Sequence, residues 1–578
     1  MKEDVNFKTE IFDRFKKYGS KDAIRYERES ISYINLKREI ERLSDTLVYA
    51  NFTTIAICID NKMKVLILAL SCIVAGIPFI VIDKTNPISF LESILQEANI
   101  STIICDEILK VKNCNCVLLN KLNRGEGSYD KKIKQETNNV LFFIATSGST
   151  GKPKVAERFT ESFWDDYKEF ECKFPFLFGQ VAQQYAKLNF SYGLENSLLL
   201  LIGGTTLCLG GLSSGVKDLN LMYREINYNQ ASIVFWATPI IKLLSKHYRL
   251  FEGMPGCIKY IYTGGEPLVV SADLIVEFRN RDIALINDYG CSEIGKVFAN
   301  PYRIKLRDMQ AFNMVGVGKA LKEYEAVIMD ENLNEVDEGY LYLKSEKRFL
   351  CSYVNKSIKT NEIKKDNYWL YNMHDIAKKE DGEIIILGRE INSVNIAGYR
   401  IELEQVEYAV NQVKGIKSCI AIPIYNQYRE VSLFCFYQGS INCQDIRFYL
   451  YDIIPSYMIP NVFVPVDRIF LLPNGKVDRK KNKELYGDIV YSKSVASREV
   501  KGRIYQYLKR IVGNDLGDFD DIYLMLFSDL GVDSLSMVDF ISTVEEKEKV
   551  LITSDGIGTR IKCLKDVIDL VNTAKTME

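Results

Sequence analysis

Histidine is scarce in this chain of 578 residues, which contains only His247 and His374. A metal site built on paired histidines, or a Ser-His-Asp triad, therefore has little to draw on. Net charge is also nearly absent, at −2, so no global field would recruit nucleic acid or an anionic membrane. We expect lysines and carboxylates to carry any chemistry, with no nucleic acid and no membrane among the partners.

Paired cysteine motifs and a secretory leader are lacking as well. The 14 cysteines are scattered without Cys-x-x-Cys spacing, and the first residues, MKEDVN, are charged rather than apolar. Such cysteine usage is typical of reduced thiols. We therefore expect a cytoplasmic protein.

One apolar run is long enough to raise the question of a membrane span. Residues 65–82 are 18 residues without a charge, which reaches the length that a spanning helix needs. The sequence Gly76-Ile77-Pro78 interrupts this run, and Pro78 would break a helix there. We expect a helix, a turn and a buried strand over 79–82 in a soluble protein.

Alternation of apolar runs predicts the fold class. A helical pattern covers 36–43, and strand-like runs follow at 54–59, 102–105, 140–145, 206–209, 233–236, 258–262 and 284–286. This order predicts an α/β fold with mainly parallel sheets and sites at the strand ends. After residue 300, shorter alternating strands at 325–329 and 340–343 predict a β-rich part, and the length implies several domains.

The chain is organised around residues 146–154 (TSGSTGKPK), which follow the apolar run 140–145. Glycines let backbone amides approach an anion, hydroxyls donate hydrogen bonds and lysines supply charge, so the segment indicates a phosphate cradle. It is not a P-loop, because Gly148 and Gly151 are three residues apart and Pro153 follows Lys152. A flexible surface loop is the alternative.

Several further segments stand in a fixed order after this loop. They are 263–268 (TGGEPL), 287–293 (NDYGCSE), 371–375 (YNMHD), 388–389 (GR), 394–402 (VNIAGYRIE) and 473–479 (PNGKVDR). Together they resemble the adenylate-forming enzymes, closest to the adenylation domains of nonribosomal peptide synthetases, over roughly residues 10–485. Residues 31–36 and 75–83 also look like early motifs of that family.

The resemblance implies that a carboxylic acid attacks the α-phosphate of ATP, giving an acyl-adenylate and pyrophosphate. The catalyst should then mainly position groups and neutralise charge. Lys476 would bridge the substrate carboxylate and the α-phosphate, and Glu293 would hold Mg²⁺. The phosphate loop would contribute Thr146, Ser147, Gly148, Ser149, Thr150, Gly151 and Lys154. Adenine and ribose contacts would come from Gly264, Gly265, Glu266, Pro267, Asn287, Tyr289, Ser292, Asp375 and Arg389, with Tyr289 stacked on adenine and Asp375 on the ribose hydroxyls.

Each of these residues has a plainer reading when taken alone. A single aspartate or glutamate is most often a solvated loop acid, a tyrosine is often core, and Lys476 follows Asn474-Gly475, a common turn. It is the co-occurrence of the motifs that favours the adenylating site.

The resemblance also implies domains. We expect a large N-terminal adenylation subdomain over 1–388, a small mobile α+β subdomain over 389–486, a polar linker over 487–497 and an all-α helical-bundle carrier domain over 498–578. Rotation of the small subdomain would withdraw Lys476 and bring 394–402 to a thiol tunnel with Gly398. His374, Ile391 and Asn395 depart from the residues usual in the family, which are glycine, aspartate and lysine, so we expect altered energetics of the rotation, while none of the three removes a phosphate, Mg²⁺ or carboxylate contact.

The tail carries a second signal. Residues 529–535 (DLGVDSL) resemble the attachment site of 4′-phosphopantetheine in carrier proteins, with Ser534 as the modified residue at the start of a helix. A plain helix N-cap is the alternative. The implied product is a thioester on Ser534, made by a stand-alone loading module of nonribosomal peptide or related natural-product biosynthesis. Its partners would be a phosphopantetheinyl transferase and a downstream condensation or acyl-transfer enzyme in trans.

The identity of the acid is less determined. Relatives that activate amino acids usually pair the α-ammonium with an aspartate in a Phe-Asp-x-Ser segment, where this chain has Ser191 in 188–195 (LNFSYGLE). A hydroxyl cannot neutralise a buried ammonium. By approximate alignment the substrate pocket would be lined by Ser191, Tyr192, Glu195, Trp236, Tyr262, Gly264 and Asp288. These residues favour an aryl or other non-α-amino acid, while Glu195 and Asp288 leave open an amino acid whose amine is placed differently.

Two other functions stay open at this point. An acyl- or aryl-CoA ligase would release a free CoA thioester, and Ser534 speaks against it. A catalytically inactive nucleotide-binding scaffold would not need Lys154, Glu293, Asp375 and Lys476, all of which are present.

Overall fold

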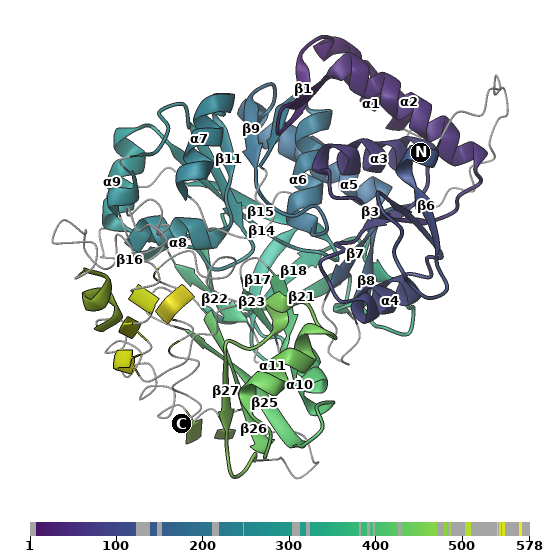
Figure 1. Cartoon of the computed structure of the whole chain (residues 1–578). Helices are drawn as coiled ribbons and strands as arrows, with labels where there is room; N and C mark the ends of the chain where they lie inside the picture. Colours follow the sequence, from purple (N-terminus) through teal and green to yellow (C-terminus); the bar gives the residue numbers. More distant parts are fainter. Residues whose placement is uncertain are drawn as a thin grey trace.

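The computed structural model of the chain describes most of the first 470 residues and short helical pieces beyond them (Figure 1). The described ranges are 7–122, 139–146, 153–210, 219–246, 248–251, 253–302, 312–318, 324–380, 383–389, 393–396, 399–425 and 431–470. The later helical residues are 479, 481–482, 485–486, 503–509, 540–541, 543–544, 546–548, 564, 566–568 and 571.

The larger sheet of the described chain has eight strands, six of them parallel. Its order is β15 (Gly295–Tyr302), β14 (Ala284–Cys291), β12 (Tyr260–Gly264), β11 (Ile233–Phe235), β9 (Val181–Gln184), β10 (Thr206–Leu209), β1 (Asp22–Tyr26) and β2 (Glu29–Ser32). The edge strands β15 and β2 are antiparallel to their neighbours. The parallel strands β10 and β11 are buried at every residue, as expected when helices cover both faces of a sheet.

The second sheet has seven strands within the described residues, in the order β19 (Ser352–Tyr353), β8 (Lys154–Phe159), β7 (Val140–Thr146), β4 (Phe79–Val81), β3 (Ile55–Cys58), β5 (Thr102–Cys105) and β6 (Asn115–Leu118). The strands from β7 to β6 are parallel, whereas β8 and β19 are antiparallel. The two sheets with these connections form the α/β fold that the sequence predicts.

Helices connect and cover these strands (Figure 1). The α-helices are α1 (Phe7–Tyr18), α2 (Tyr33–Tyr49), α3 (Lys62–Ala75), α4 (Ile88–Glu97), α5 (Thr160–Lys173), α6 (Ser191–Ile202), α7 (Leu219–Asn229), α8 (Thr238–Lys246) and α9 (Ala272–Asn280). Short 3-10 turns are η1 (Leu119–Lys121), η2 (Pro175–Leu177) and η3 (Tyr248–Phe251). Helices α3 and α6 are buried on nearly every face, which explains the apolar character of most of α3 and of the second half of α6.

Helix α3 confirms the sequence interpretation of the long apolar run. The helix ends at Gly76, which has φ of +69°, and β4 follows directly after Pro78. Of the residues that the structure describes, no helix combines the length and apolar character needed to cross a membrane.

The part after residue 300 is rich in β-strands, as predicted. Its sheet runs β17 (Glu325–Met329), β18 (Glu338–Ser345), β21 (Tyr368–Glu380) and β20 (Glu362–Lys365), and β22 (Glu383–Arg389) also pairs with β21. A separate pair joins β13 (Val269–Ser271) to β16 (Phe312–Met314).

The C-terminal elements form a smaller layer at the bottom of Figure 1. They are the hairpin β23 (Ser393–Ile396) and β24 (Tyr399–Glu402), then α10 (Leu403–Asn411), β25 (Ile416–Tyr425), β26 (Val431–Gly439), α11 (Cys443–Tyr451), η5 (Ser456–Met458) and β27 (Val462–Pro465). Val394 and Leu403 share one buried apolar cluster with Ile80 and Val155 of the second sheet. The hairpin is therefore packed against the large sheets.

An ion pair joins two of the helical pieces beyond residue 500. Arg503 donates to both carboxylate oxygens of Glu548 at 2.9 and 3.0 Å, and the Tyr507 hydroxyl donates to the same group. Residues 510–539 and the linker 487–497 lie outside the described residues, so the carrier bundle and the domain boundaries stay predictions.

The end of α3 gives a stability prediction. Gly76→Ala should lower the free energy of unfolding by about 1–2 kcal/mol, because a left-handed backbone crowds a Cβ. Gly256→Ala is the matched control, since Gly256 lacks a positive φ and nothing lies within 4 Å of an added Cβ. Urea denaturation of both variants measures the difference. Equal losses would show that the conformation of Gly76 does not terminate this helix.

Candidate active site

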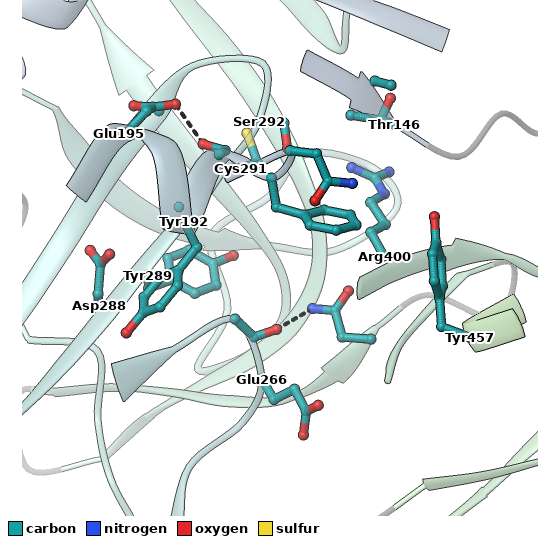
Figure 2. A pocket seen from close by; sticks show the side chains of 18 of the residues that line it. Thr146, Tyr192, Glu195, Glu266, Asp288, Tyr289, Cys291, Ser292, Arg400 and Tyr457 are labelled. Carbon is teal, nitrogen blue, oxygen red and sulfur yellow. Dashed lines mark hydrogen bonds between the residues drawn. The ribbon is translucent and has the colours of Figure 1, made fainter. Parts of the chain in front are cut away.

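A cleft opens at the carboxyl ends of the parallel strands of the larger sheet, where β21, β22 and the β23–β24 hairpin approach (Figure 2). Its walls include the turn after β12, the end of β14, the start of α6 and residues of the hairpin. The cleft thus gathers segments that are more than two hundred residues apart in the chain.

Tyr289 and Asp375, predicted to bind adenine and ribose, lie together in this cleft. The Tyr289 hydroxyl donates a hydrogen bond to Asp375 Oδ2, and the Asp375 side chain is buried. Asp375 is also the register partner of Arg389 on β22. Asn287 lines the same wall, and its amide donates to the carbonyls of Val315 and Gly316 at 3.4 and 3.3 Å.

His374 shows why a glycine is usual before this aspartate. Its φ is +57°, in the left-handed region, and its backbone N–H donates to Asn372 Oδ1 at 2.8 Å. Histidine tolerates this region better than branched residues do, although at some cost. The backbone at His374 therefore keeps the left-handed conformation beside Asp375, with a larger side chain and at a cost in conformational free energy.

The turn after β12 is shaped by close packing. A Cβ on Gly264 would lie 2.4 Å from the carbonyl oxygen of Asp288, and Gly265 has φ of +93°. Glu266 forms a buried ion pair with Lys242 at 2.8 Å. Glu266, Pro267 and Gly265 line the cleft, whereas Gly264 lies directly behind it.

The β23–β24 hairpin reaches into the cleft. Asn395 Nδ2 donates to the carbonyl of Gly265 at 2.7 Å, so the residue that replaces the family's frequent lysine docks on the turn after β12. Tyr399 packs edge-on against Phe190, with ring centroids 4.4 Å apart, and stacks on Tyr457 at 4.2 Å.

Glu293 lies almost fully buried beside this hairpin. The Tyr353 hydroxyl donates to its Oε1 at 2.9 Å, and Arg400 Nη1 lies 3.5 Å from the same atom. Arg400 also pairs with Glu402 at 3.0 Å. Burial alone would lower the pKa of Arg400, but the carboxylates of Glu293 and Glu402 outweigh it and raise that pKa. The guanidinium therefore stays charged at the centre of the site.

The donor set around Glu293 can be compared with the needs of Mg²⁺. In the part of the chain that the structure describes, no three His, Cys, Asp or Glu residues cluster as metal ligands. Mg²⁺ commonly uses one or two carboxylates and takes its other ligands from phosphates and water. Glu293 fits this pattern together with ATP, provided that Arg400 moves from its present position.

The predicted phosphate loop is closed by a hairpin. Thr146 ends β7 and is the register partner of Lys154 at the start of antiparallel β8, so a strand follows the loop where a P-loop has a helix. Lys154 Nζ lies 5.9 Å from the centre of the Tyr353 ring. Thr146 lines the cleft, and Ser147, Gly148, Ser149, Thr150 and Gly151 lie outside the described residues.

A buried guanidinium stands behind the predicted substrate pocket. Arg158 is fully buried and pairs with Asp166 at 2.5 Å and with Glu195 at 3.1 Å. Ser191 also donates to Glu195, at 2.5 Å. Glu195 therefore lines the pocket with both of its carboxylate oxygens already hydrogen-bonded.

A second buried ion pair lies on β14 and β15. Lys296 Nζ is 2.7 Å from Asp288 Oδ2 and donates to the Tyr262 hydroxyl at 3.0 Å. Burial raises the pKa of Asp288, and Lys296 opposes that rise. Both Asp288 and Lys296 line the cleft.

The remaining predicted pocket residues take different places. Tyr192 lines the cleft, and its hydroxyl donates to the Tyr262 carbonyl at 3.1 Å. Tyr262 is fully buried just behind the lining. Trp236 corrects the sequence prediction: its indole is fully buried in an apolar cluster with Tyr223 and Leu244 and does not line the cleft. Sequence alignment cannot distinguish an inward strand-end residue from one on the opposite face.

Three residues of the site were missing from the sequence prediction. Arg158, Lys296 and Arg400 are all buried or half-buried cations that meet predicted carboxylates. The available signal was that a buried carboxylate needs a counter-charge. The sequence offers many lysines and arginines, and only the folded structure shows which of them reaches each acid.

Other predicted residues cannot be located. Gly398, Lys476 and Ser534 lie outside the described residues, and for Arg389 the backbone alone is described. Ser292 lines the cleft next to Cys291, whose pKa is raised to about 12 by burial.

Comparisons with known proteins agree with this geometry. The family model described as AMP-binding enzyme matches residues 11–352. Gramicidin S synthase 2 of Brevibacillus brevis is 24% identical over 546 residues, which cover 91% of this chain but only 12% of that protein. The chain thus spans a small part of that relative's length. The D-alanine–D-alanyl carrier protein ligase of Bacillus licheniformis is 25% identical, over 82% of this chain and 99% of that protein.

A solved structure shares the fold. The structure of holo-PA1221, described as a nonribosomal peptide synthetase protein containing adenylation and PCP domains, has a TM-score of 0.68 with this chain at 17% identity. The match covers 97% of this chain and 96% of that chain.

The strained backbone at His374 leads to a prediction. His374→Val should lower the free energy of unfolding by about 1–2 kcal/mol and weaken ATP binding, because a branched residue resists positive φ beside Asp375. His374→Gly should leave both nearly unchanged. Urea denaturation and calorimetric titration with ATP measure the effects.

Lys379→Val is the matched control, since Lys379 is exposed on the same strand and has no positive φ. If His374→Val proved no more harmful than this control, the strain at His374 would have no energetic role.

Proposed function

Because this chain belongs to the AMP-binding enzymes and is an adenylate-forming ligase, we propose that it activates a carboxylic acid as an acyl-adenylate and loads it onto the 4′-phosphopantetheine thiol at Ser534. The observation that carries the proposal is one cleft lined by Tyr289, Asp375 and Thr146 at the mouth of the 146–154 hairpin, with Glu293 in contact with Arg400 of the lining. These groups suit a nucleotide in which the α-phosphate is attacked by a carboxylate.

In the adenylation step the chain mainly positions charge. Tyr289 offers a flat ring to adenine, and Asp375, with Arg389 beside it in register, accepts the ribose hydroxyls. Lys154 and the loop amides hold the phosphate oxygens, and Lys476 neutralises charge between the acid and the α-phosphate. Glu293 would hold Mg²⁺, which supplies neutralisation of the departing pyrophosphate.

The segment that carries Lys476 is followed by a residue, Arg479, whose ion pair with the small subdomain the structure describes. Arg479, three residues later, makes a bidentate ion pair with Glu407 of α10, at 2.6 and 2.8 Å, and also donates to the Ala421 carbonyl. Bidentate pairs fix geometry as well as charge. We infer that this anchor ties the segment carrying Lys476 to the small subdomain, 389–486, so that both move together.

The second step would use the other face of the small subdomain. In the present arrangement Arg400 and Asn395 touch Glu293 and Gly265, so the β23–β24 hairpin lies at the site. We propose that rotation after the first step withdraws Lys476 and brings this hairpin, with Gly398, to the site, and that the thiol enters along it. The attached group supplies the thiol that accepts the acyl chain.

For the substrate, we propose an aryl or other non-α-amino carboxylic acid. Ser191 cannot pair with an α-ammonium, and its hydroxyl is already committed to Glu195, which Arg158 compensates. An amino acid is the alternative substrate. The loaded product would pass to a condensation or acyl-transfer enzyme in trans, and a phosphopantetheinyl transferase would be needed to modify Ser534.

One experiment separates the three candidate functions. ATP–pyrophosphate exchange is measured on phosphopantetheinylated full-length protein with a panel of acids. Exchange followed by covalent loading supports the proposal. Exchange with release of a CoA thioester and an unmodified Ser534 supports an acyl- or aryl-CoA ligase, and no exchange with any acid supports an inactive scaffold.

Removal of Lys476 should separate the two half-reactions. Lys476→Ala should lower exchange by about 100-fold or more, since one charge-stabilising donor is typically worth 10²–10³ in rate. A chemically supplied acyl-adenylate should still load Ser534. Equal loss of both steps, measured by exchange and by mass spectrometry of the loaded chain, would contradict the proposed role of Lys476.

Ser534→Ala should have the opposite pattern. Exchange should stay at the level of the unmodified chain because the adenylation site is untouched, and covalent loading should disappear because no thiol is attached. Intact-mass measurement after incubation with ATP and acid gives the answer. Persistent loading on the variant would overturn the carrier assignment.

A further inference from the structure

The carboxylate of Asp288 is only half satisfied. Its Oδ2 pairs with Lys296 at 2.7 Å, but its Oδ1 is buried and receives no hydrogen bond from any residue that the structure describes. The Tyr262 hydroxyl accepts from Lys296 at 3.0 Å and is also hydrogen-bonded to the Asp288 carboxylate, which leaves Oδ1 as the oxygen without a donor. Because a buried acceptor without a partner costs free energy, a bound molecule that donates to Oδ1 gains affinity.

The other pocket carboxylate has no such vacancy. Glu195 Oε1 accepts from Ser191 at 2.5 Å and from Arg158 Nε at 3.3 Å, while Oε2 accepts from Arg158 Nη2 at 3.1 Å. Glu195 thus shapes the pocket wall and adds negative charge to it, whereas Asp288 has an oxygen that can accept a hydrogen bond from a bound molecule.

The buried charges around the pocket do not cancel. Arg158 and Lys296 supply two positive charges, and Asp166, Glu195 and Asp288 supply three negative charges, all of them buried. Glu195 adds to the field that raises the pKa of Asp288, so the two groups act on each other. A single cation bound in the pocket would balance this surplus.

The location of Asp288 constrains where a cationic group would be. In Figure 2, Asp288 lies on the far side of the pocket from Thr146 and Arg400, with Tyr192 near Asp288 in the view. The reacting carboxylate must face the phosphate side, where Thr146 ends β7. A group that reaches Asp288 is therefore remote from the carboxylate that reacts.

We propose that Asp288 and Lys296 form a specificity subsite for an amino group that the acid carries away from its reacting carboxylate. The inference rests on the proposed acid activation and names its substrate class, an aliphatic or arylalkyl acid that carries an alkyl amine away from the α-carbon. The ammonium donates to Asp288 Oδ1 and balances the surplus charge. Lys296 keeps Asp288 oriented through Oδ2 and leaves Oδ1 to the substrate.

The test compares matched acids in ATP–pyrophosphate exchange on phosphopantetheinylated protein. One set is 3-(aminomethyl)benzoate, 3-(hydroxymethyl)benzoate and 3-methylbenzoate, and the other is 4-aminobutanoate, 2-aminobutanoate and butanoate. In the set whose size suits the pocket, kcat/KM for the remote amine should exceed that for its unsubstituted partner by about 10- to 100-fold, the range for a hydrogen bond to a charged group. A preference for the unsubstituted, hydroxylated or α-amino acid would overturn the proposal.

A charge-neutral variant tests the residue itself. Asp288→Asn keeps the side-chain shape, so the ratio of kcat/KM for the amine to kcat/KM for the unsubstituted acid should fall to about twofold or less, mainly through KM. Because this change leaves Lys296 buried without its counter-ion, the double variant Asp288→Asn/Lys296→Met removes both charges together. Retention of the full amine preference in either variant would contradict the role of Asp288.

Failure of the inference differs from failure of the proposed function. Exchange that shows no amine preference overturns the subsite and leaves acid activation standing. Absence of exchange with every acid overturns both. If neither variant folds, as judged by thermal melting, the wild-type panel still decides the proposal.

Discussion

The Arg158 guanidinium holds the centre of the molecule together. It is fully buried, comes from β8 of the second sheet, and meets Asp166 on α5 and Glu195 on α6. Gly295 of the larger sheet lies so close that an added Cβ would be 2.2 Å from Arg158 Nη2. Both sheets and two helices therefore depend on one cation, and its loss would leave two buried carboxylates uncompensated.

This contact also connects stability to the pocket. Glu195 is part of the cleft wall, yet its orientation is fixed from behind by Arg158 and from the side by Ser191. The β14–β15 hairpin repeats the arrangement with Lys296 behind Asp288. In both cases a buried cation presents a carboxylate to the cleft, so the pocket is preorganised by the same ion pairs that stabilise the core.

Sequence reasoning predicted the fold where apolar periodicity is strong. The helix, turn and strand over 62–81 and the β-rich part near 325–343 were predicted and confirmed. The nucleotide residues Tyr289 and Asp375 were predicted from motifs, and the structure brings their side chains together. Lys296 could not be assigned in this way, because its pairing with Asp288 arises from the register of β14 and β15, which a linear pattern does not specify.

Trp236 shows that a sequence pattern does not specify which way a strand-end side chain points. A strand-end aromatic can face the cleft or the core, and the apolar cluster around Trp236 decides for the core. At His374 the departure from the family pattern changes the conformational free energy and not the backbone geometry. The backbone keeps the left-handed conformation that glycine would adopt freely.

The contact between Arg400 and Glu293 joins residues 107 positions apart across the cleft. A cation that binds Glu293 must displace this guanidinium, so the two occupancies are thermodynamically linked. By reciprocity, the factor by which the docked hairpin weakens the cation's affinity equals the factor by which the cation disfavours docking. The cation's dissociation constant, measured by equilibrium titration, therefore also reports the equilibrium between docked and undocked hairpin, and no label on the hairpin is needed.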